Sequence, residues 1–392
     1  MALRAKSLPQ TSPPHDSRVT DLPPLSADRT AVPDAAMVGA SVARILASGT
    51  LTNGDTVREL ELRAAAYLGV RHCIATASGT TALTVALGSV GATGEAAMPA
   101  FTSSATLHAV RAGGFEPVFA DVDPATMAVS ADAVAARIGT RTGVIVATHP
   151  LGMPCDVDGL AAVAADYGVR IVFDAASAFG AEHAGRKVGG FGDAEIFSLS
   201  STKVLVAGEG GLIATDDDAL ATRCRHARGD DERRGPGMGP AGMNARMSEL
   251  HAAVALASFE TLEDRLAWRR ALAKRYRLAL RDLPGVSFPR APEGDLGTHR
   301  EFVVFLGTPF GREVEDVVDT LRMQGVDAHR TCAEPLHRGE TVRAHAGPRE
   351  LPGTDVASAQ AVSLPIWDRM RVDDLEAVVR AFRACCAGTV LS

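Results

Sequence analysis

The sequence predicts an α/β protein with a mostly parallel central sheet. Two observations lead to this expectation: short apolar runs alternate with stretches of helical spacing, and several of the runs are rich in β-branched residues. Strands that alternate with helices in this way form βαβ units, whose crossovers are almost always right-handed.

The expected elements follow one another in a regular order. Two helices come first, over VGASVARILASG and GDTVRELELRAAAYLG. The strands are then HCIATAS, EAAMPA, EPVFADVD, GVIVATHP and VRIVFDAAS. The helices between them are TTALTVALGSV, SSATLHAVRAG, SADAVAARI and DVDGLAAVAADYG. A further strand pair, DAEIFSLS and GGLIATD, brackets the segment SSTKVLVAGEG, and one long helix is expected over residues 248–283.

Composition narrows the class of protein. The chain has 392 residues, of which 46% are hydrophobic, so two or three domains with a large core are expected. No run of 18 apolar residues is free of charges and turn formers, and the net charge of −7 is unlike that of a nucleic-acid-binding protein. The six cysteines are scattered without paired metal spacing, which predicts no metal site and a reduced, cytoplasmic setting.

Three regions are expected along the chain. Residues 1–33 are predicted to be an extended or disordered arm that buries little, because prolines such as Pro13 and Pro23 interrupt regular structure. No apolar stretch follows Lys6, so a signal peptide is not expected. Residues 34–265 form the predicted large domain, and residues 266–392 form a smaller α+β domain.

Three features lie just after predicted strands, where parallel sheets bind their ligands. The segment 78–81, SGTT, opens a helix whose free N–H groups favour a phosphate, although it is also an ordinary helix cap. Asp174 ends a buried strand, either as a structural cap or as the partner of a cofactor's ring nitrogen. Lys203 lies in a hydroxyl-rich, glycine-flanked segment, where burial would lower its pKa and make it a nucleophile.

Together, these three features fit pyridoxal 5′-phosphate (PLP). The aldehyde of PLP needs a lysine for its Schiff base, the ring nitrogen needs an acidic partner, and the phosphate needs backbone donors. A lysine released from that Schiff base would carry a proton between the substrate Cα and C4′ of the cofactor. The sequence therefore predicts a PLP enzyme that uses Lys203 and Asp174.

The sequence also resembles the DegT/DnrJ/EryC1/StrS aminotransferases, which are fold-type I PLP enzymes that act on keto sugars and cyclitols. The resemblance covers about residues 38–382. It rests on TASGTTAL, VFADVDPATM, THPLGMPCDVDGL, the stretch from IVFDAAS to GGLIAT, GMNARMSELHAAVAL and SLPIWDRM. It implies a homodimer with shared active sites and an amino-acid donor such as Glu or Gln. It also implies a keto sugar, cyclitol or related keto acceptor, and a place in sugar or antibiotic biosynthesis.

The resemblance further implies roles for individual residues. Lys203 would carry the Schiff base and Asp174 would pair with the ring nitrogen. Cofactor-binding residues would include Gly79 and Thr80 through their backbone N–H groups, Ser198 through its hydroxyl, Ser103 and Ser177, and Asn244 reaching the phosphate of the partner subunit. His149 and His329 are candidates on the substrate side, and a structural role for His149 is equally expected.

Three positions depart from the family pattern. Ser103 stands where an aromatic residue usually stacks on the ring, and Phe101 is the candidate to replace it. Ser177 stands in place of Gln or His, and Cys332-Ala333 replaces a His-Tyr pair. These changes leave two alternatives open: another PLP reaction, such as elimination, aldol cleavage or C–C bond formation, and a non-catalytic ligand sensor, against which Lys203 and Asp174 argue. Lys203 also argues against the sugar dehydratases of the family, which lack this lysine.

Overall fold

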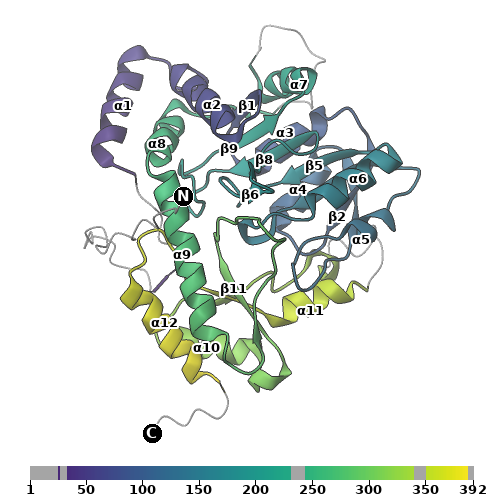
Figure 1. Ribbon diagram of the computed structural model, residues 1–392. Coiled ribbons are helices and arrows are strands. Elements are labelled where there is room, and N and C mark those ends of the chain that lie inside the picture. The colour runs from purple at the N-terminus through teal and green to yellow at the C-terminus, as the bar shows by residue number, and fades with distance from the viewer. Residues whose placement is uncertain (1–24, 27–32, 231–242, 340–349, 387–392) are drawn as a thin grey trace, which may run out of the picture.

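The computed structural model describes residues 25–26, 33–230, 243–339 and 350–386. In these ranges the chain forms a seven-stranded sheet, a four-stranded sheet and a short two-stranded hairpin. We call the larger sheet with its helices the large domain and the smaller sheet with its helices the small domain. Figure 1 shows the long helix α9 (Leu262–Leu280) running from one to the other. No helix in the described ranges is long and apolar enough to cross a membrane.

The large sheet confirms the predicted α/β class. Its strand order is β1-β9-β8-β5-β4-β2-β3, in which β2 to β5 and β8 run parallel while β9 is antiparallel to both of its neighbours. The strands are β1 (His72–Thr76), β2 (Gly94–Pro99), β3 (Phe115–Ala120), β4 (Thr142–Thr148), β5 (Arg170–Asp174), β8 (Ala194–Ser198) and β9 (Gly211–Thr215).

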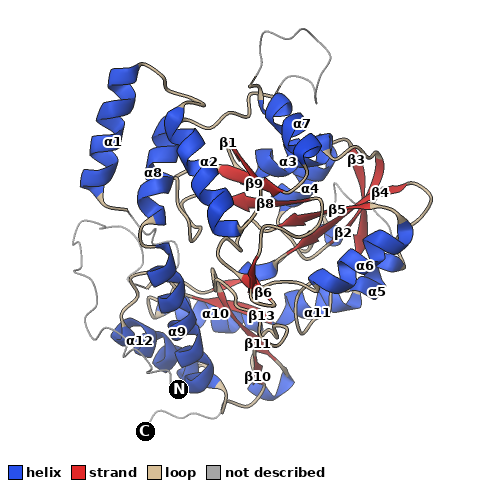
Figure 2. Ribbon diagram, turned by 45° about the horizontal axis from the view of Figure 1, so that its top comes forward, coloured by secondary structure: helices blue, strands red, loops and turns tan. Residues whose placement is uncertain are grey.

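Helices cover both faces of the large sheet (Figure 2). Alternate strand residues explain this, because Val144 packs into the core on one face and its neighbour Ile145 into the core on the other. On the first face lie α3 (Gly79–Ser89), α4 (Ser104–Ala112) and α7 (Asp218–Arg228). On the second lie α2 (Asp55–Leu68), α5 (Ala131–Ala135), α6 (Val157–Tyr167) and α8 (Glu249–Phe259). The helix α1 (Ala35–Ser48) stands outside, beside α8.

The small domain is an antiparallel sheet covered by helices. Its strands, in the order β10-β11-β13-β12, are β10 (Val286–Ser287), β11 (Phe302–Leu306), β13 (Ala361–Leu364) and β12 (His329–Arg330). Its helices are α9, α10 (Val314–Met323), α11 (Pro352–Gln360) and α12 (Val372–Ala384). Tyr276, Phe302 and Phe382 are fully buried between them. The remaining elements are the hairpin β6 (Glu182–His183) and β7 (Arg186–Lys187) and the 3₁₀ turns Pro150–Gly152, Thr308–Phe310 and Leu336–Arg338.

The single helix expected over residues 248–283 is wrong, because α8 ends at Phe259 and α9 begins at Leu262. The side chain of Arg265 explains the break: its Nη2 donates to the Ser258 carbonyl at 2.6 Å and thereby replaces the next backbone donor of a continuous helix. Leu266 in α9 packs on the large-domain core, whereas Tyr276 packs on the small-domain core. The chain thus passes between the cores within α9, and the boundary near residue 265 stays a prediction.

Most of the predicted arm, residues 1–33, lies outside the described residues. Leu25 forms a backbone bridge with Val326, and its carbonyl accepts from the N–H of Asp327 at 3.1 Å. Ser26 is 1% exposed, and its hydroxyl donates to the Asp327 carboxylate at 2.7 Å. The expectation that the arm buries little therefore does not hold at these two residues, which pack on the small domain.

Candidate active site

Two adjoining cavities open at the carboxyl ends of the large-domain strands. Cavity A, of about 300 Å³, is bounded on one side by the small domain, and cavity B, of about 270 Å³, reaches the start of α3. Asp174 and Lys203 line both cavities and so lie where the two meet. The structure therefore brings together the carboxylate and the amine that the sequence singled out, at the edge where parallel sheets bind ligands.

Asp174 is the last residue of β5, and its carboxylate is hydrogen-bonded through both oxygens. Thr106 Oγ1 donates to Oδ2 at 2.7 Å, and the N–H of Ala176 donates to Oδ1 at 3.1 Å. Burial raises the pKa of Asp174 above its usual value, while the bonds from Thr106 and Ala176 and the charge of Lys203 oppose that rise. A cation placed against this carboxylate would be strongly favoured, since it would restore the stabilisation that burial removes.

Lys203 projects from the loop between β8 and β9, and its Nζ donates to Ser177 Oγ at 3.0 Å. Burial, with a smaller contribution from the charge of Arg300, lowers the pKa of Lys203 to about 8. A substantial fraction of the amine is therefore neutral near physiological pH, which a nucleophile and proton carrier requires. Ser177, which stands where the family has Gln or His, thus holds the lysine in this chain.

Cavity B ends at the start of α3, next to the end of β8. The hydroxyl of Ser78, the N-cap residue, accepts from the N–H of Thr81 at 3.1 Å. The N–H groups of Gly79 and Thr80 have no acceptor within the helix. A Cβ on Gly79 would lie 2.7 Å from the Cβ of Ser198, so only glycine permits this close approach. Two free N–H groups and a serine hydroxyl at a helix start form a cradle for an anion.

His149 lines cavity A, but its ring nitrogens face the protein. Nδ1 accepts from the N–H of Cys155 at 3.0 Å, and Nε2 lies 3.9 Å from the carboxylate of Glu195, which is fully buried. Burial lowers the pKa of His149 to about 3, so the ring is neutral and carries its proton on Nε2. The ring stacks on Phe173 with 5.3 Å between centroids. This geometry favours the structural interpretation of His149.

Neither Ser103 nor Phe101 is placed to stack an aromatic ring on the cofactor. Ser103 lines both cavities and caps α4, because its hydroxyl accepts from the N–H of Ala105 at 3.2 Å. Phe101 is 4% exposed and packs in a cluster with Met127 and Phe305, although it also lines cavity A. Phe101 is therefore fixed in the wall, and no Trp, Tyr or second Phe side chain lines either cavity in the described chain.

The small domain supplies a wall of cavity A that sequence reasoning largely missed. Only His329 was expected there, and it is joined by Glu301, Arg330 and Thr331. The carboxylate of Glu301 is paired with Arg300 and lies 3.7 Å from His329 Nε2. Burial alone would raise the pKa of Glu301, but His329 and Arg300 lower that pKa to about 2. The side chain of Glu301 is therefore an anion.

Two hydroxyl groups of cavity A have no partner. Thr148 and Thr331 are 6% and 8% exposed, and neither Oγ1 has a hydrogen-bond partner in the described protein. Cys332, which together with Ala333 stands in place of the His-Tyr pair of the family pattern, lines the same wall and adopts a left-handed backbone conformation with φ 51°. Single threonines at such positions have no local sequence signature, so only the folded chain shows that they meet at one cavity.

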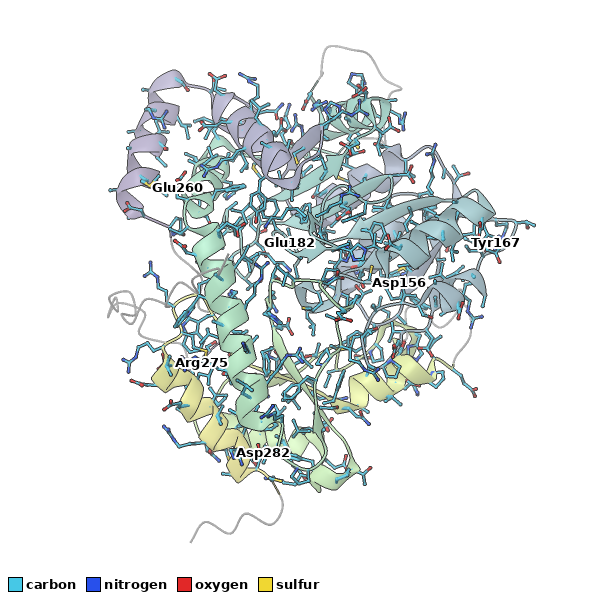
Figure 3. All side chains as sticks on the ribbon, in the orientation of Figure 1. Asp156, Tyr167, Glu182, Glu260, Arg275 and Asp282 are labelled. Carbon is cyan, nitrogen blue, oxygen red and sulfur yellow. The ribbon has the colours of Figure 1, made fainter. Side chains whose placement is uncertain are left out.

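A loop at residues 295–299, the linking loop, ties the small domain to this site. Asp295 pairs with His183 Nδ1 at 3.0 Å, and Leu296 exchanges two backbone hydrogen bonds with Glu182. Figure 3 shows Glu182 near the middle of the molecule. Thr298 Oγ1 donates to the carbonyl of Ser177 at 2.8 Å, which is the residue that holds Lys203.

Asn244 lines neither cavity and is exposed in this single chain. The residue after it, Ala245, accepts a hydrogen bond from the N–H of Ala77 at 2.9 Å. Asn244 therefore lies beside the β1–α3 connection that carries Gly79, on the outside of the molecule. The cross-subunit contact expected for Asn244 stays a prediction, and its exposed position leaves the side chain free to reach a neighbour.

The comparisons with known proteins now decide the family. The model of the DegT/DnrJ/EryC1/StrS aminotransferase family matches residues 35–383. The chain belongs to this family. It is 33% identical over 334 residues to the UDP-2-acetamido-2-deoxy-3-oxo-D-glucuronate aminotransferase of Pseudomonas aeruginosa, covering 84% of this chain and 90% of the relative. It is 32% identical to the GDP-perosamine synthase of Caulobacter vibrioides, covering 84% and 89%.

Solved structures agree with this family assignment. The crystal structure of DesI in the presence of its TDP-sugar product superposes with a TM-score of 0.88 at 37% identity, covering 93% of each chain. The structure of ntda from Bacillus subtilis with bound cofactor PMP (pyridoxamine phosphate) has a TM-score of 0.82 at 25% identity, covering 90% of this chain and 81% of that one. The family's members are PLP-dependent aminotransferases, so the predicted enzyme class and cofactor are confirmed.

The described residues fit this cofactor. Cavity B offers an anion cradle at the start of α3 that a Cβ on Gly79 would close. The carboxylate of Asp174 lies where both cavities meet, and burial leaves it short of a positive partner, which a protonated ring nitrogen would be. The amine of Lys203 lines the same two cavities, within reach of a ligand held by both groups.

Proposed function

We propose that this aminotransferase moves an amino group from an amino acid, Glu or Gln, to the keto group of a sugar, cyclitol or related cyclic polyol. The observation that carries the proposal is the set of polar groups that line cavity A together with Lys203, among them Glu301, Thr148 and Thr331. A few placed polar groups in a partly apolar lining can bind the hydroxyl groups of a ring while its carbon atoms pack on the rest. The relatives named above, which act on nucleotide-linked sugars by their names, support the same substrate class.

We propose the following roles for the residues of the chain. When bound, PLP supplies an electron sink that stabilises negative charge at the substrate carbon bearing the nitrogen. Asp174 holds the proton on the ring nitrogen, and Gly79, Thr80 and Ser198 bind the phosphate. Lys203 Nζ takes the proton from the substrate carbon and delivers it to C4′ of the cofactor. Its pKa of about 8 suits an amine that must both accept and donate a proton.

The small-domain wall is proposed to orient the acceptor. The anionic Glu301 accepts hydrogen bonds from substrate hydroxyl groups, with His329 as its neighbour in the wall. Thr331 in the same wall, and Thr148 at the end of β4 on the large-domain side, offer two further hydroxyls that have no partner in the described protein. A polyol that fills these positions would satisfy groups that are otherwise costly to bury.

A two-step absorbance experiment tests the proposed reaction. Adding Glu or Gln alone to the holoenzyme should remove the visible absorbance of the bound cofactor, and adding a keto sugar should restore it. The variant Lys203→Ala serves as the control, which should show neither change. If Glu and Gln leave the absorbance unchanged, while an amino acid with a leaving group on its β-carbon, such as serine, is released as a keto acid and free ammonia with loss of water, the reaction is an elimination and the proposal is wrong.

We also propose a homodimer with shared active sites. Asn244 is exposed beside the cofactor end of α3, and the apolar side chains of Met37, Leu46 and Leu51 on or near α1 are 46%, 60% and 51% exposed. Several large apolar side chains exposed on and beside one outer helix are compatible with an interface there. The dimer would place the partner's Asn244 against the phosphate.

Mixing two inactive variants tests the shared site. Each proposed site takes Lys203 from one chain and Asn244 from the other. In a hybrid of Asn244→Ala with Lys203→Ala, one of the two sites therefore has both native residues. The loss of one hydrogen bond to the phosphate should cost about 1.5–3 kcal/mol of cofactor binding in Asn244→Ala. A fully active monomer, or a mixture with no more activity than its parts, would contradict the proposal.

A cytoplasmic location completes the proposal. No disulfide is found among the six cysteines, all of which lie in the described ranges, and five of them are buried. Thiols that form no disulfide are typical of a reducing compartment. Cell fractionation with an antibody against the chain tests this location.

A further inference from the structure

Two threonine hydroxyls form a line that ends on the carboxylate of Asp174. Thr102 Oγ1 lies 3.0 Å from Thr106 Oγ1, which donates to Asp174 Oδ2 at 2.7 Å. Thr106 is 2% exposed and lies in the first turn of α4, whereas Thr102 precedes that helix and lines cavity A. The hydrogen bond from Thr106 thus links the side chain of Asp174, at the end of β5, to α4, which lies between β2 and β3 in the chain.

The start of α4 fixes this line in place. The hydroxyl of Ser103 accepts from the N–H of Ala105, and the carbonyl of Ser103 accepts from the N–H of Thr106 at 3.1 Å. These bonds close the first turn and set the direction of the Thr106 side chain. Thr102 lies one residue before the cap and outside the helix, and its hydroxyl meets that of Thr106 across the first turn.

The protons of the line can be assigned by counting. An ionised carboxylate only accepts, so Thr106 must give its one hydroxyl proton to Asp174. The contact between the two threonines then requires Thr102 to donate to Thr106. If Asp174 takes up a proton, it becomes the donor and the whole line reverses. The order from Thr102 through Thr106 to Asp174 is thus the one that an ionised Asp174 requires, and in it each bond polarises the next.

We propose that Thr106, supported by Thr102, is a positioning residue that keeps Asp174 ionised and directed at the ring nitrogen of PLP. The inference rests on the proposed role of Asp174 and extends it to two residues outside that role. Thr106 and the N–H of Ala176 bind one oxygen each, which holds the carboxylate against rotation. The remaining lone pairs of Asp174 are available to the cavities that it lines.

The need for such support follows from the burial of the carboxylate. Burial raises the pKa of Asp174, and a neutral carboxylic acid could not hold a proton on the ring nitrogen. The hydrogen bond from Thr106 is the largest of the interactions that lower that pKa again. A single hydroxyl thus favours the charge state on which the proposed chemistry depends.

A binding experiment with two ligands tests the inference. All variants carry Lys203→Ala, so that a covalent bond does not mask the affinity. The dissociation constant is measured for PLP and for its carbon analogue, in which a C–H replaces the ring nitrogen. Thr106→Val should weaken PLP binding on the order of 10- to 100-fold, because a hydrogen bond to a charged group is lost, and leave the analogue unchanged.

Matched variants separate this role from a structural one. Thr106→Ser keeps the hydroxyl and should retain PLP binding, while Thr102→Val should weaken it less than Thr106→Val does. With Lys203 intact, the ring nitrogen of ¹⁵N-labelled PLP should lose its proton at a pH on the order of one unit lower in Thr106→Val. Thr106→Ala gives the same comparison if the valine variant does not fold.

The outcomes distinguish the inference from the function on which it rests. If Thr106→Val weakens PLP and the analogue equally, or leaves both unchanged, the inference is wrong. Asp174→Asn is the reference, and it should weaken PLP far more than the analogue. A failure of that reference overturns the proposed role of Asp174 itself, whereas a normal reference with an unaffected Thr106→Val overturns only the inference.

Discussion

The two walls of the active site differ in how their charged groups are held. On the large-domain side, Asp174 is hydrogen-bonded through both oxygens, and Lys203 is held by Ser177. On the small-domain side, Glu301 is paired with Arg300, and Arg330 Nε and Thr331 Oγ1 have no partner in the described chain. Thr148 Oγ1, on the large-domain side of the same cavity, lacks a partner as well. An unmade buried hydrogen bond costs about 1–3 kcal/mol, so a ligand of cavity A that bonds to these groups would offset that cost.

Removing the amine should have the largest effect on the large-domain wall. We expect Lys203→Ala to reduce kcat by at least about 10²- to 10⁴-fold, the usual contribution of a positioned proton carrier. Lys187→Ala is the matched control, because Lys187 pairs with Glu182 and Glu263 outside both cavities. Steady-state kinetics and borohydride labelling check this, and labelling at Lys187 in place of Lys203 would contradict the assignment.

A change in the small-domain wall should affect one substrate only. We expect Glu301→Gln to raise the KM of the keto acceptor on the order of 10- to 100-fold, because an anionic acceptor of hydrogen bonds becomes neutral. The rate at which the amino-acid donor converts the cofactor should stay the same. Glu315→Gln is the control, since Glu315 pairs with Arg330 on the exposed side. If Glu301→Gln impaired the reaction with the amino-acid donor as much as the reaction with the keto acceptor, the small-domain wall would not be specific to the acceptor.

The pH dependence of cofactor loading reports on the lysine alone. Only the neutral amine attacks an aldehyde, so the loading rate of the PLP-free enzyme should rise about tenfold per pH unit and level off near the Lys203 pKa of about 8. With a lysine of ordinary pKa, the loading rate would continue to rise until the pH approached 10.5. Stopped-flow absorbance measures the rate, and a simple alkylamine corrects for the titration of free PLP. A rate that still climbs well above pH 9 would show that Lys203 is not perturbed.

The smallest expected effect concerns the missing aromatic. Ser103→Trp should tighten PLP binding by a factor on the order of 2–10, since stacking contributes about 0.5–1.5 kcal/mol beyond area burial. Because Ser103 caps α4, the same change should lower the free energy of unfolding by about 0.5–2 kcal/mol. Cofactor titration and thermal melting measure the two effects, and weaker PLP binding would place the ring elsewhere.

Phe101→Ala is the companion to that variant. Phe101 is buried with Met127 and Phe305, so its removal should lower the free energy of unfolding by about 3–5 kcal/mol. Its effect on PLP affinity should be small once stability is taken into account. A strong and specific loss of PLP binding would show that Phe101 stacks after all.

The same contrast explains how far the sequence could be interpreted. The large-domain residues were predictable because each follows an apolar strand, and the carboxyl ends of parallel strands meet at one edge. Asp174, Lys203 and Gly79 were found in this way. Thr106 was missed because a threonine in the first turn of a helix is ordinary, and its bond to Asp174 joins residues 68 positions apart.

The small-domain wall had no comparable signal. Glu301 precedes β11 and Thr331 follows β12, and these two strands become neighbours of β13 only in the folded sheet. The break between α8 and α9 was hidden for a similar reason, since helical spacing continues through it and a side chain, Arg265, ends the first helix. Contacts made by single side chains across the fold leave no pattern in a single sequence.

The linking loop gives the enzyme a mechanical connection between its two halves. Thr298 holds the carbonyl of Ser177, the hydroxyl of Ser177 holds the lysine amine, and Glu301 follows within three residues of Thr298. The same short stretch of chain therefore carries both a carboxylate of the acceptor wall and a hydrogen bond to the residue that holds the amine. A ligand bound by Glu301 would lie only three residues along the backbone from the threonine that fixes Ser177.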